Sequence, residues 1–121
     1  MSYDDNNIFA KILKGEIPCK KIYENEFILS FYDINPQKKI HALVIPKGKY
    51  IDLDDFSQNA SAEEMVGLLK GINAVAKKLG ISADTGKGYR ALANISEDGG
   101  QEVPHLHFHL FGGEKIGKMV T

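Results

Sequence analysis

The stretch "HLHFHLF", from residue 105 to residue 111, is the feature that most constrains what this chain can fold into. It places His105, His107 and His109 at every second position, with apolar residues between and after them. Side chains on a β-strand alternate between its two faces, so the stretch predicts a strand with three imidazoles on one face. The histidines would lie about 7 Å apart along the strand, and the apolar face would anchor them on a core.

The composition is that of an ordinary globular protein. The chain has 121 residues, so we expect one domain over residues 1–121. The formal net charge is −1 and there is no basic run, which argues against binding to nucleic acid or to a membrane surface. There is no signal-peptide pattern, and no apolar run approaches the roughly 18 residues of a membrane span. The single Cys19 excludes an intrachain disulfide, and we expect a cytoplasmic protein.

Hydrophobic periodicity predicts hairpins interrupted by one long helix. The long helix has the strongest signals, because Ser61 and Glu64 can form a capping box and Gly80 suits its C-terminal end. An α+β fold follows, with an antiparallel sheet covered by helices on one face. In chain order we expect a short helix within 6–18, two strands within 20–33, a strand over 40–47, the long helix over 61–80, a strand over 89–95 and a final strand over 103–113.

Three interpretations of the histidine row remain open from the residues themselves. The first is a half-exposed strand whose polar positions have no chemical role. The second is a metal site, in which imidazoles converge at about 2.1 Å on one ion and His41 serves as a further ligand. No carboxylate alternates with the histidines to act as a base there. The third is a nucleophile, because a neutral imidazole can attack phosphorus when its other nitrogen donates to a fixed acceptor. We favour the third.

The turn before the histidine row predicts an anion site. Within "EDGGQE", Gly99 and Gly100 allow backbone N–H groups to approach an anion closely. Asn94 and Gln101 can donate through their side-chain amides. The sequence therefore predicts a phosphate site beside the imidazoles.

The chain also resembles a known family. "HLHFHLF" fits the His-φ-His-φ-His-φ-φ pattern of the histidine triad (HIT) superfamily. "IFAKILKGEIP", "FYDINPQKKIHALVIPK" and "NISEDGGQEVPHLHFHLFGG" are similar to its Hint branch, the purine-nucleotide-binding phosphoramidases. The resemblance implies a homodimer whose sheets join, and binding of purine monophosphates such as AMP and GMP. It implies hydrolysis of nucleoside 5′-phosphoramidates at the P–N bond, and of acyl-adenylates, through a nucleotidyl-histidine intermediate, without metal or other cofactor.

The resemblance also implies roles for individual residues. His107 would be the nucleophile, with its other ring nitrogen held by a backbone carbonyl of the triad. His109 would contact the phosphate and assist at the leaving group, while His105 would be a support bonded to His41. The implied nucleotide contacts are Asn94, Gly100, Gln101 and Glu102 for the phosphate, Asp33 for the ribose, and Ile8, Phe9, Phe31, Tyr32 and Ile34 for the base.

Two positions leave alternatives. Glu102 stands where some family members carry a serine, and a carboxylate repels a phosphate, so only its backbone N–H is expected to help. Asp33 is followed by "INPQ", so it also suits a turn cap. The rival functions are a dinucleoside polyphosphate hydrolase of the same superfamily, a metal-dependent hydrolase and a non-catalytic nucleotide-binding regulator.

Overall fold

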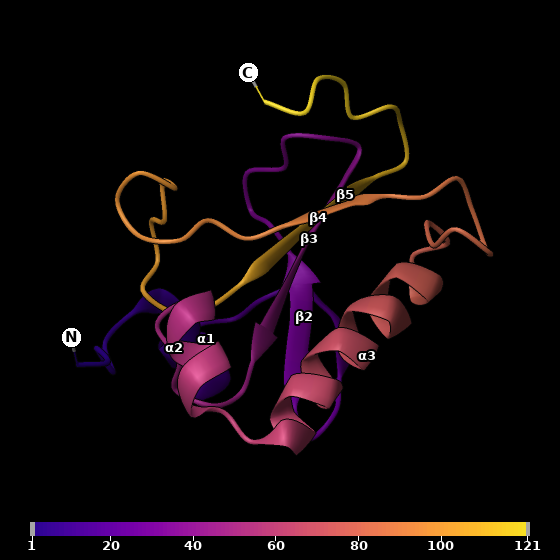
Figure 1. Cartoon of the computed structure of the whole chain (residues 1–121). Helices are drawn as coiled ribbons and strands as arrows, with labels where there is room; N and C mark the ends of the chain where they lie inside the picture. The colour runs from indigo at the N-terminus through magenta and orange to yellow at the C-terminus, as the bar shows by residue number, and fades with distance from the viewer. Residues whose placement is uncertain (1, 121) are drawn as a thin grey trace.

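The computed structural model describes residues 2–120 and contains a five-stranded antiparallel sheet in the order β1-β2-β3-β5-β4 (Figure 1). The α+β class predicted from the sequence is therefore confirmed. The strands are β1 (Lys21–Glu24), β2 (Ile28–Tyr32), β3 (Ile40–Pro46), β4 (Arg90–Leu92) and β5 (Phe108–Gly112). The helices are α1 (Ile8–Leu13), α2 (Leu53–Asn59) and α3 (Ala62–Lys78). No helix within residues 2–120 is both long and apolar enough to cross a membrane.

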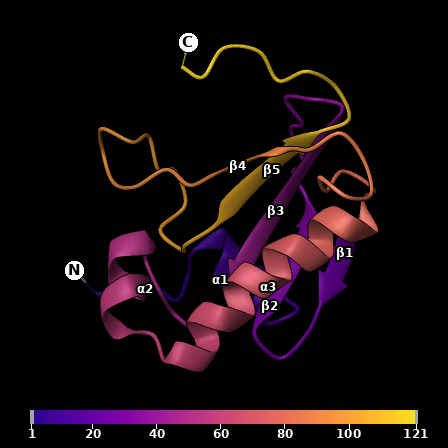
Figure 2. The same cartoon turned by 45° about the vertical axis from the view of Figure 1, so that its right-hand side comes forward.

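The central strand β3 is buried on both of its faces, and the alternation of its side chains divides the core in two. Ala42 and Val44 belong to a buried cluster that includes Leu68 and Ile72 of α3. Figures 1 and 2 show α3 lying across this face of the sheet. The Ser61 side chain accepts from the Glu64 N–H, and the Glu64 side chain accepts from the Ser61 N–H, so the predicted capping box is present.

The opposite face of the sheet is covered by α1. Leu43 and Ile45 of β3 form a second buried cluster with Phe9, Leu29 and Phe31. The expectation that helices cover only one face is therefore wrong. The short α1 packs its buried Phe9 on this second face. The Asn7 side chain caps the helix and accepts from the Ala10 N–H at 2.9 Å.

Two further elements differ from expectation. Helix α2 was not predicted, although Asp52 caps it and Asp54 and Asp55 complement its dipole in the first turn. The final strand begins only at Phe108, so two of the three histidines precede it.

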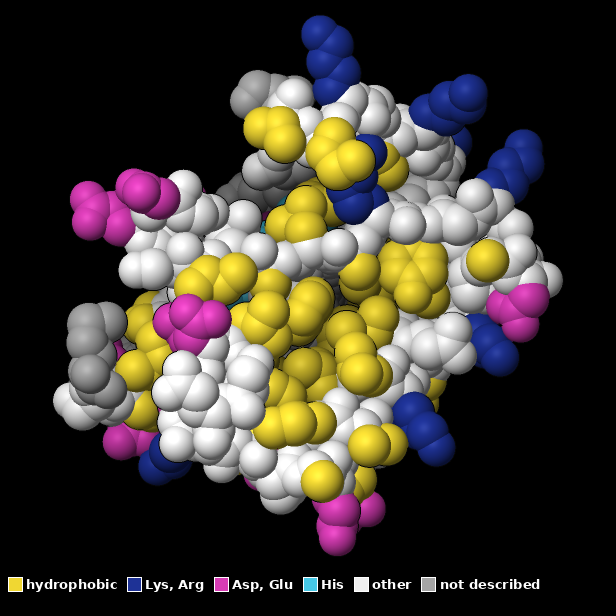
Figure 3. Space-filling view, in the orientation of Figure 1, with side chains coloured by type: hydrophobic (Ala, Val, Ile, Leu, Met, Phe, Trp, Pro, Cys, Tyr) yellow, Lys and Arg dark blue, Asp and Glu magenta, His cyan; other side chains and the backbone are white. Residues whose placement is uncertain are grey.

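The outer surface on the α3 side is partly apolar. Figure 3 shows hydrophobic side chains gathered across the middle of the face seen in Figure 1, with basic side chains projecting from its rim. Among the described residues, Val66 and Leu69 are the exposed large hydrophobic side chains of α3.

Candidate active site

The segment that carries His105 and His107 is bent and tied to the chain leaving β3. The Leu106 N–H donates to the Tyr50 carbonyl at 2.8 Å, and His105 Nε2 lies 2.8 Å from the Pro46 carbonyl. The N–H groups of His105 and Leu106 are taken by the carbonyls of Val103 and Tyr50, and Pro104 has no N–H, so none of the three can donate to a strand ladder that would extend β5. The three histidines therefore do not form one evenly spaced row: only His109 stands on β5.

His107 presents one ring nitrogen as an acceptor. Its Nδ1 lies 2.7 Å from the His105 backbone carbonyl, so Nδ1 carries the proton and Nε2 keeps its lone pair. The Phe9 ring meets the His107 ring edge-on, with centroids 4.9 Å apart. Burial lowers the pKa of His107, while the carboxylates of Asp33 and Glu102 act in the opposite direction. The neutral, single-tautomer imidazole that a nucleophile requires is thus present.

His109 is oriented by His41. The Gln37 backbone N–H donates to His41 Nδ1 at 3.2 Å, so His41 carries its proton on Nε2. This Nε2–H lies 2.9 Å from His109 Nδ1, which makes Nδ1 the acceptor and places the His109 proton on its own Nε2. Burial lowers the pKa of His109 to about 4, and the neighbouring His107 and His41 rings add to the shift. His109 is therefore a neutral hydrogen-bond donor through Nε2.

His105 has different partners from those expected. The resemblance implied a network with His41, but His105 Nδ1 meets the Tyr3 hydroxyl at 2.6 Å and Nε2 meets Pro46. His105 is 0% exposed, and burial lowers its pKa to about 4. The expected pairing with His41 is wrong because His105 lies against Pro46 at one end of β3, whereas His41 lies near the other end of that strand. Tyr3 was missed by the sequence analysis, since its partner is about a hundred residues away and no local pattern marks it.

Asp33 serves both as a turn cap and as a neighbour of the histidines. Its Oδ1 accepts from the Asn35 N–H at 2.8 Å, and its Oδ2 lies 3.5 Å from His41 Nε2. Within the described residues, Asp33, His41 and His109 are the group whose ligand atoms all lie within 4.8 Å of one another, a distance that a metal ion would suit. The Gln37 N–H favours a proton on His41 Nε2, however, and this proton occupies the position where a metal would need a lone pair. The group fits a hydrogen-bond relay better than a metal site.

The glycine-rich turn is closed on itself. The Gly100 N–H donates to the Glu97 carbonyl, so it is not free for the anion site that the sequence predicted at Gly99 and Gly100, and the Gln101 N–H donates to the Ser96 carbonyl. The Gln101 side chain is also occupied: Nε2 donates to Ile51 O at 2.7 Å and Val103 O at 3.0 Å. Gly100 has a positive φ of +76°, a conformation that glycine adopts at little cost in a tight turn. Gln101 therefore holds the turn against the segment before α2.

Asn94 and Glu102 are the remaining predicted phosphate contacts. Asn94 lies two residues after β4, whose last residue, Leu92, pairs with His109 of β5. Asn94 is half-buried, and Glu102 is exposed.

The predicted base contacts separate into core and surface residues. Phe9 and Phe31 are buried in the cluster beneath α1, and Phe31 is only 3% exposed. Ile8 and Tyr32 are exposed, and Ile34 is 85% exposed. The latter three are thus the apolar side chains available to a ligand.

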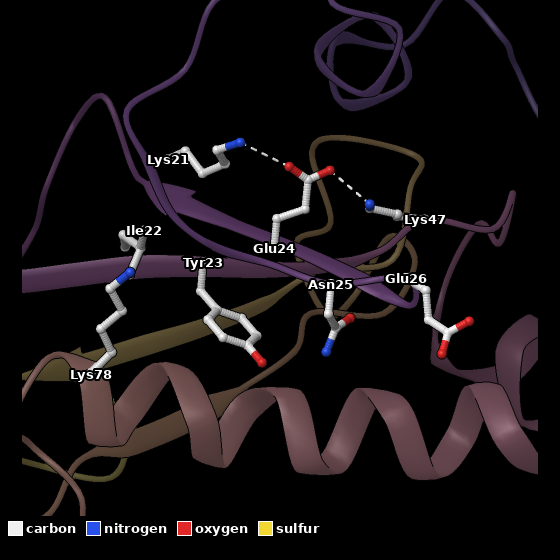
Figure 4. A pocket seen from close by; sticks show the side chains of 8 residues that line it. All are labelled: Lys21, Ile22, Tyr23, Glu24, Asn25, Glu26, Lys47 and Lys78. Carbon is white, nitrogen blue, oxygen red and sulfur yellow. Dashed lines mark hydrogen bonds and ion pairs between the residues drawn. The ribbon is translucent and has the colours of Figure 1, made fainter.

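A surface hollow also lies away from the histidines. Figure 4 shows a hollow of about 560 Å³ beside β1, lined by Lys21, Glu24, Lys47 and their neighbours. Glu24 is bonded to Lys21 at 2.9 Å and to Lys47 at 2.7 Å, and these bonds, that to Lys47 first, lower the pKa of Glu24 to about 2. Glu24 is thus fully engaged by Lys21 and Lys47, and none of the predicted site residues lines this hollow.

Comparisons with known proteins agree with the arrangement of the histidines. The family model described as HIT domain matches residues 14–116. A HIT-like protein of Azospirillum brasilense is 53% identical over 120 residues, covering 99% of this chain and 96% of that protein. The purine nucleoside phosphoramidase of Escherichia coli K12 is 38% identical over 118 residues, covering 97% of this chain and 95% of that protein.

Solved structures show the same fold. A HIT family hydrolase from Clostridium thermocellum superposes with a TM-score of 0.85 at 37% identity, covering 98% of this chain and 99% of that one. A histidine triad protein from Clostridium difficile gives a TM-score of 0.80 at 40% identity, covering 98% of each chain. Sequence, fold and the spatial grouping of the histidines thus agree, and the chain belongs to the HIT family.

Proposed function

We propose that this protein is a purine nucleotide hydrolase that cleaves nucleoside 5′-phosphoramidates, and related acyl-adenylates, through a nucleotidyl-histidine intermediate. The observation that carries the proposal is the His107 imidazole, whose Nδ1 is held by the His105 carbonyl at 2.7 Å. This contact leaves Nε2 with a lone pair for attack on phosphorus. The phosphoramidase activity named for the Escherichia coli relative, at 38% identity, supports the choice of substrate class.

The reaction has two displacements at phosphorus. His107 Nε2 forms a bond to the α-phosphorus while the P–N bond breaks, and the leaving nitrogen, protonated from solvent, departs as an amine. In the imidazolium formed on His107, the Nδ1–H still donates to the His105 carbonyl, and this hydrogen bond stabilises the positive charge. Water then attacks the phosphorus, the P–Nε2 bond breaks, and a proton returns to solvent. Throughout, the Nε2–H of His109 is a donor for a phosphoryl oxygen.

The nucleotide is proposed to lie over the exposed residues beside the histidines. Asp33 would accept from the ribose hydroxyls with Oδ2, since Oδ1 is occupied by Asn35. Ile8, Tyr32 and Ile34 are the exposed apolar side chains for a purine such as that of AMP or GMP. Asn94 and the Glu102 N–H would face the phosphate.

The protein is further proposed to be a homodimer with a shared sheet. The sheet has two edge strands, β1 and β4. Charged side chains on an edge discourage strand pairing, and β1 carries Lys21 and Glu24. Strand β4 exposes Ala91, and the guanidinium of its Arg90 already donates to the carbonyls of Gly117 and Lys118, so β4 is the better edge for a second copy. The molar mass of the native protein in solution tests whether it is a dimer.

Trapping the intermediate tests the reaction. Rapidly quenched mixtures with an adenosine phosphoramidate should contain a nucleotidyl adduct, located on His107 by mass spectrometry. His107→Ala should lower kcat by at least 1,000-fold, in line with the loss of a nucleophile, while His107→Asn keeps a polar side chain as a matched control for packing.

The substrate panel separates the rivals. Faster turnover of a diadenosine polyphosphate than of the phosphoramidate would favour a dinucleoside polyphosphate hydrolase. Tight AMP binding without turnover of any substrate would indicate a nucleotide-binding regulator and contradict the proposal. Loss of activity on chelation, restored by a divalent metal, would overturn the metal-independent route.

A further inference from the structure

The chain before α1 lies against the histidine segment rather than extending away from it. We name residues 3–7 the N-terminal strap. Its first residue, Tyr3, meets His105 Nδ1 through its hydroxyl at 2.6 Å, and the two rings are edge-to-face with centroids 5.6 Å apart. This contact joins positions 102 residues apart in the sequence.

Independent contacts hold the N-terminal strap in place. Asp5 Oδ1 pairs with Lys49 Nζ at 2.8 Å, and Lys14 Nζ donates to the Asp5 carbonyl at 3.0 Å. The Asn7 side chain donates to the Asp4 carbonyl at 2.7 Å and caps α1 with its oxygen. Lys49 precedes Tyr50, whose carbonyl holds Leu106. The strap and the histidine segment are therefore tied to the same stretch of chain.

The two bonds of His105 complement each other. A carbonyl can only accept, so the Pro46 carbonyl at 2.8 Å requires the proton on His105 Nε2. His105 Nδ1 then has a lone pair that is buried and needs a donor, and the Tyr3 hydroxyl at 2.6 Å is that donor. Removing the hydroxyl would leave a buried acceptor unsatisfied and permit the other tautomer, which breaks the bond to Pro46.

His105 matters to the chemistry through its backbone. Its carbonyl accepts from His107 Nδ1–H at 2.7 Å, which sets both the tautomer and the direction of the proposed nucleophile. A chain of contacts therefore runs from Tyr3 through the His105 ring and backbone to His107. Fixing the partner of a catalytic imidazole orients the imidazole itself.

We propose that Tyr3 is a positioning residue of the active site, which acts through His105 to hold His107 in the geometry for attack on phosphorus. This inference rests on the proposed function, because it assigns His107 as the nucleophile. It gives the N-terminal strap a part in turnover that does not depend on contact with the nucleotide.

The test is Tyr3→Phe in the full chain, which removes one oxygen and keeps the ring. With an adenosine phosphoramidate, kcat should fall about tenfold while KM stays within twofold, because orientation of the nucleophile is disturbed and substrate binding is not. In ¹⁵N spectra of the imidazoles, His105 should change from a single Nε2–H tautomer to a mixture. Tyr23→Phe is the matched control, because Tyr23 lies on β1 and packs against the cluster under α3. It should leave both readouts unchanged.

The outcomes are distinguishable. A fall in kcat with the His105 tautomer unaltered would show that Tyr3 has a merely structural part, and unchanged kcat would show that it has none; either result overturns the inference. A second variant, Lys49→Gln, loosens the strap without touching a histidine and should lower kcat by a smaller factor. If the wild-type protein turned over no phosphoramidate, the proposed function would fail, while the ¹⁵N spectra would still report whether Tyr3 sets the His105 tautomer.

Discussion

At the scale of single residues, the four histidines differ in their partners although all are neutral. His107 donates to a backbone carbonyl, His109 accepts from His41, and His105 is held between Tyr3 and Pro46. The alternating pattern in the sequence marked His105, His107 and His109 as a group, but not His41. It could not distinguish their tautomers, because each tautomer depends on a partner brought in by the fold: the Gln37 N–H, the Pro46 carbonyl and the Tyr3 hydroxyl.

Glu102 places a negative charge near the proposed phosphate site. Its exposed carboxylate lies close enough to His107 to raise the pKa of that ring against the larger effect of burial. Glu102→Gln should therefore increase kcat/KM for an anionic nucleotide about fivefold at low salt, corresponding to about 1 kcal/mol of repulsion removed. The gain should shrink in 0.5 M salt, because surface charges are screened over a few ångströms there. Steady-state kinetics at the two salt concentrations measure both effects.

The sign of the pH dependence gives a second readout of Glu102→Gln. Loss of a nearby negative charge lowers the pKa of His107 further, so the neutral nucleophile should persist to lower pH and the acid limb of kcat/KM should move down. Glu97→Gln, in the same loop and also exposed, is the control and should change neither quantity appreciably. A lower kcat/KM in Glu102→Gln would mean that the carboxylate binds the substrate favourably.

At the scale of elements, local signals predicted most of the structure. The capping box of α3 and the continuous apolar run of β3 are short-range features, and each element formed where they indicated. Helix α2 was missed because its core contact is a single buried Phe56, too little to produce a periodic pattern. The start of β5 was misplaced because the histidine alternation begins at His105, three residues before the strand, and the Leu106 N–H bonds to Tyr50 instead of a neighbouring strand.

The packing of α3 on β2 depends on two glycines within the helix. A Cβ at Gly67 would lie 2.5 Å from the Phe27 ring, and a Cβ at Gly71 would lie 2.8 Å from an Ile28 side-chain carbon. Gly67→Ala should therefore destabilise the protein by about 1–3 kcal/mol through overpacking, even though alanine favours a helix by about 1 kcal/mol over glycine. Urea unfolding measures the change, with Asn73→Ala on the exposed side of α3 as the control. Greater stability of Gly67→Ala would show that α3 can move away from the sheet at little cost.

At the scale of the whole molecule, the two faces of the sheet have separate tasks. One face packs under α3, and the other carries α1, His41 and His109, whose strands are neighbours in the sheet. The sequence predicted the sheet and the grouping of the histidines, because both follow from alternation and order. The Tyr3 contact and the closure of the glycine-rich turn are set by long-range packing, which no local pattern encodes.

Burial of the histidines makes the stability of the fold depend on pH. The pKa of His105 and of His109 is lowered to about 4, and burial lowers the pKa of His41 and His107 as well. Between these values and the unfolded pKa of about 6.5, the unfolded chain binds more protons than the folded one. The free energy of unfolding should therefore be highest above about pH 6.5 and fall steadily as the pH decreases toward 4.

The contribution of His105 alone can be isolated. A pKa lowered from 6.5 to about 4 corresponds to about 3 kcal/mol of stability at pH 7 that is lost by pH 4. Urea unfolding across this range should give a shallower slope for His105→Gln, which cannot take up the proton, although its stability at pH 7 is also lower. Glu24→Gln is the matched control: the pKa of Glu24 is lowered from 4.5 to about 2, so this change should alter the slope of the curve only below about pH 4.5. An unchanged slope between pH 6.5 and 4.5 in His105→Gln would mean that the buried ring is protonated without unfolding, and that the Tyr3–His105–Pro46 contacts rearrange to accept the charge.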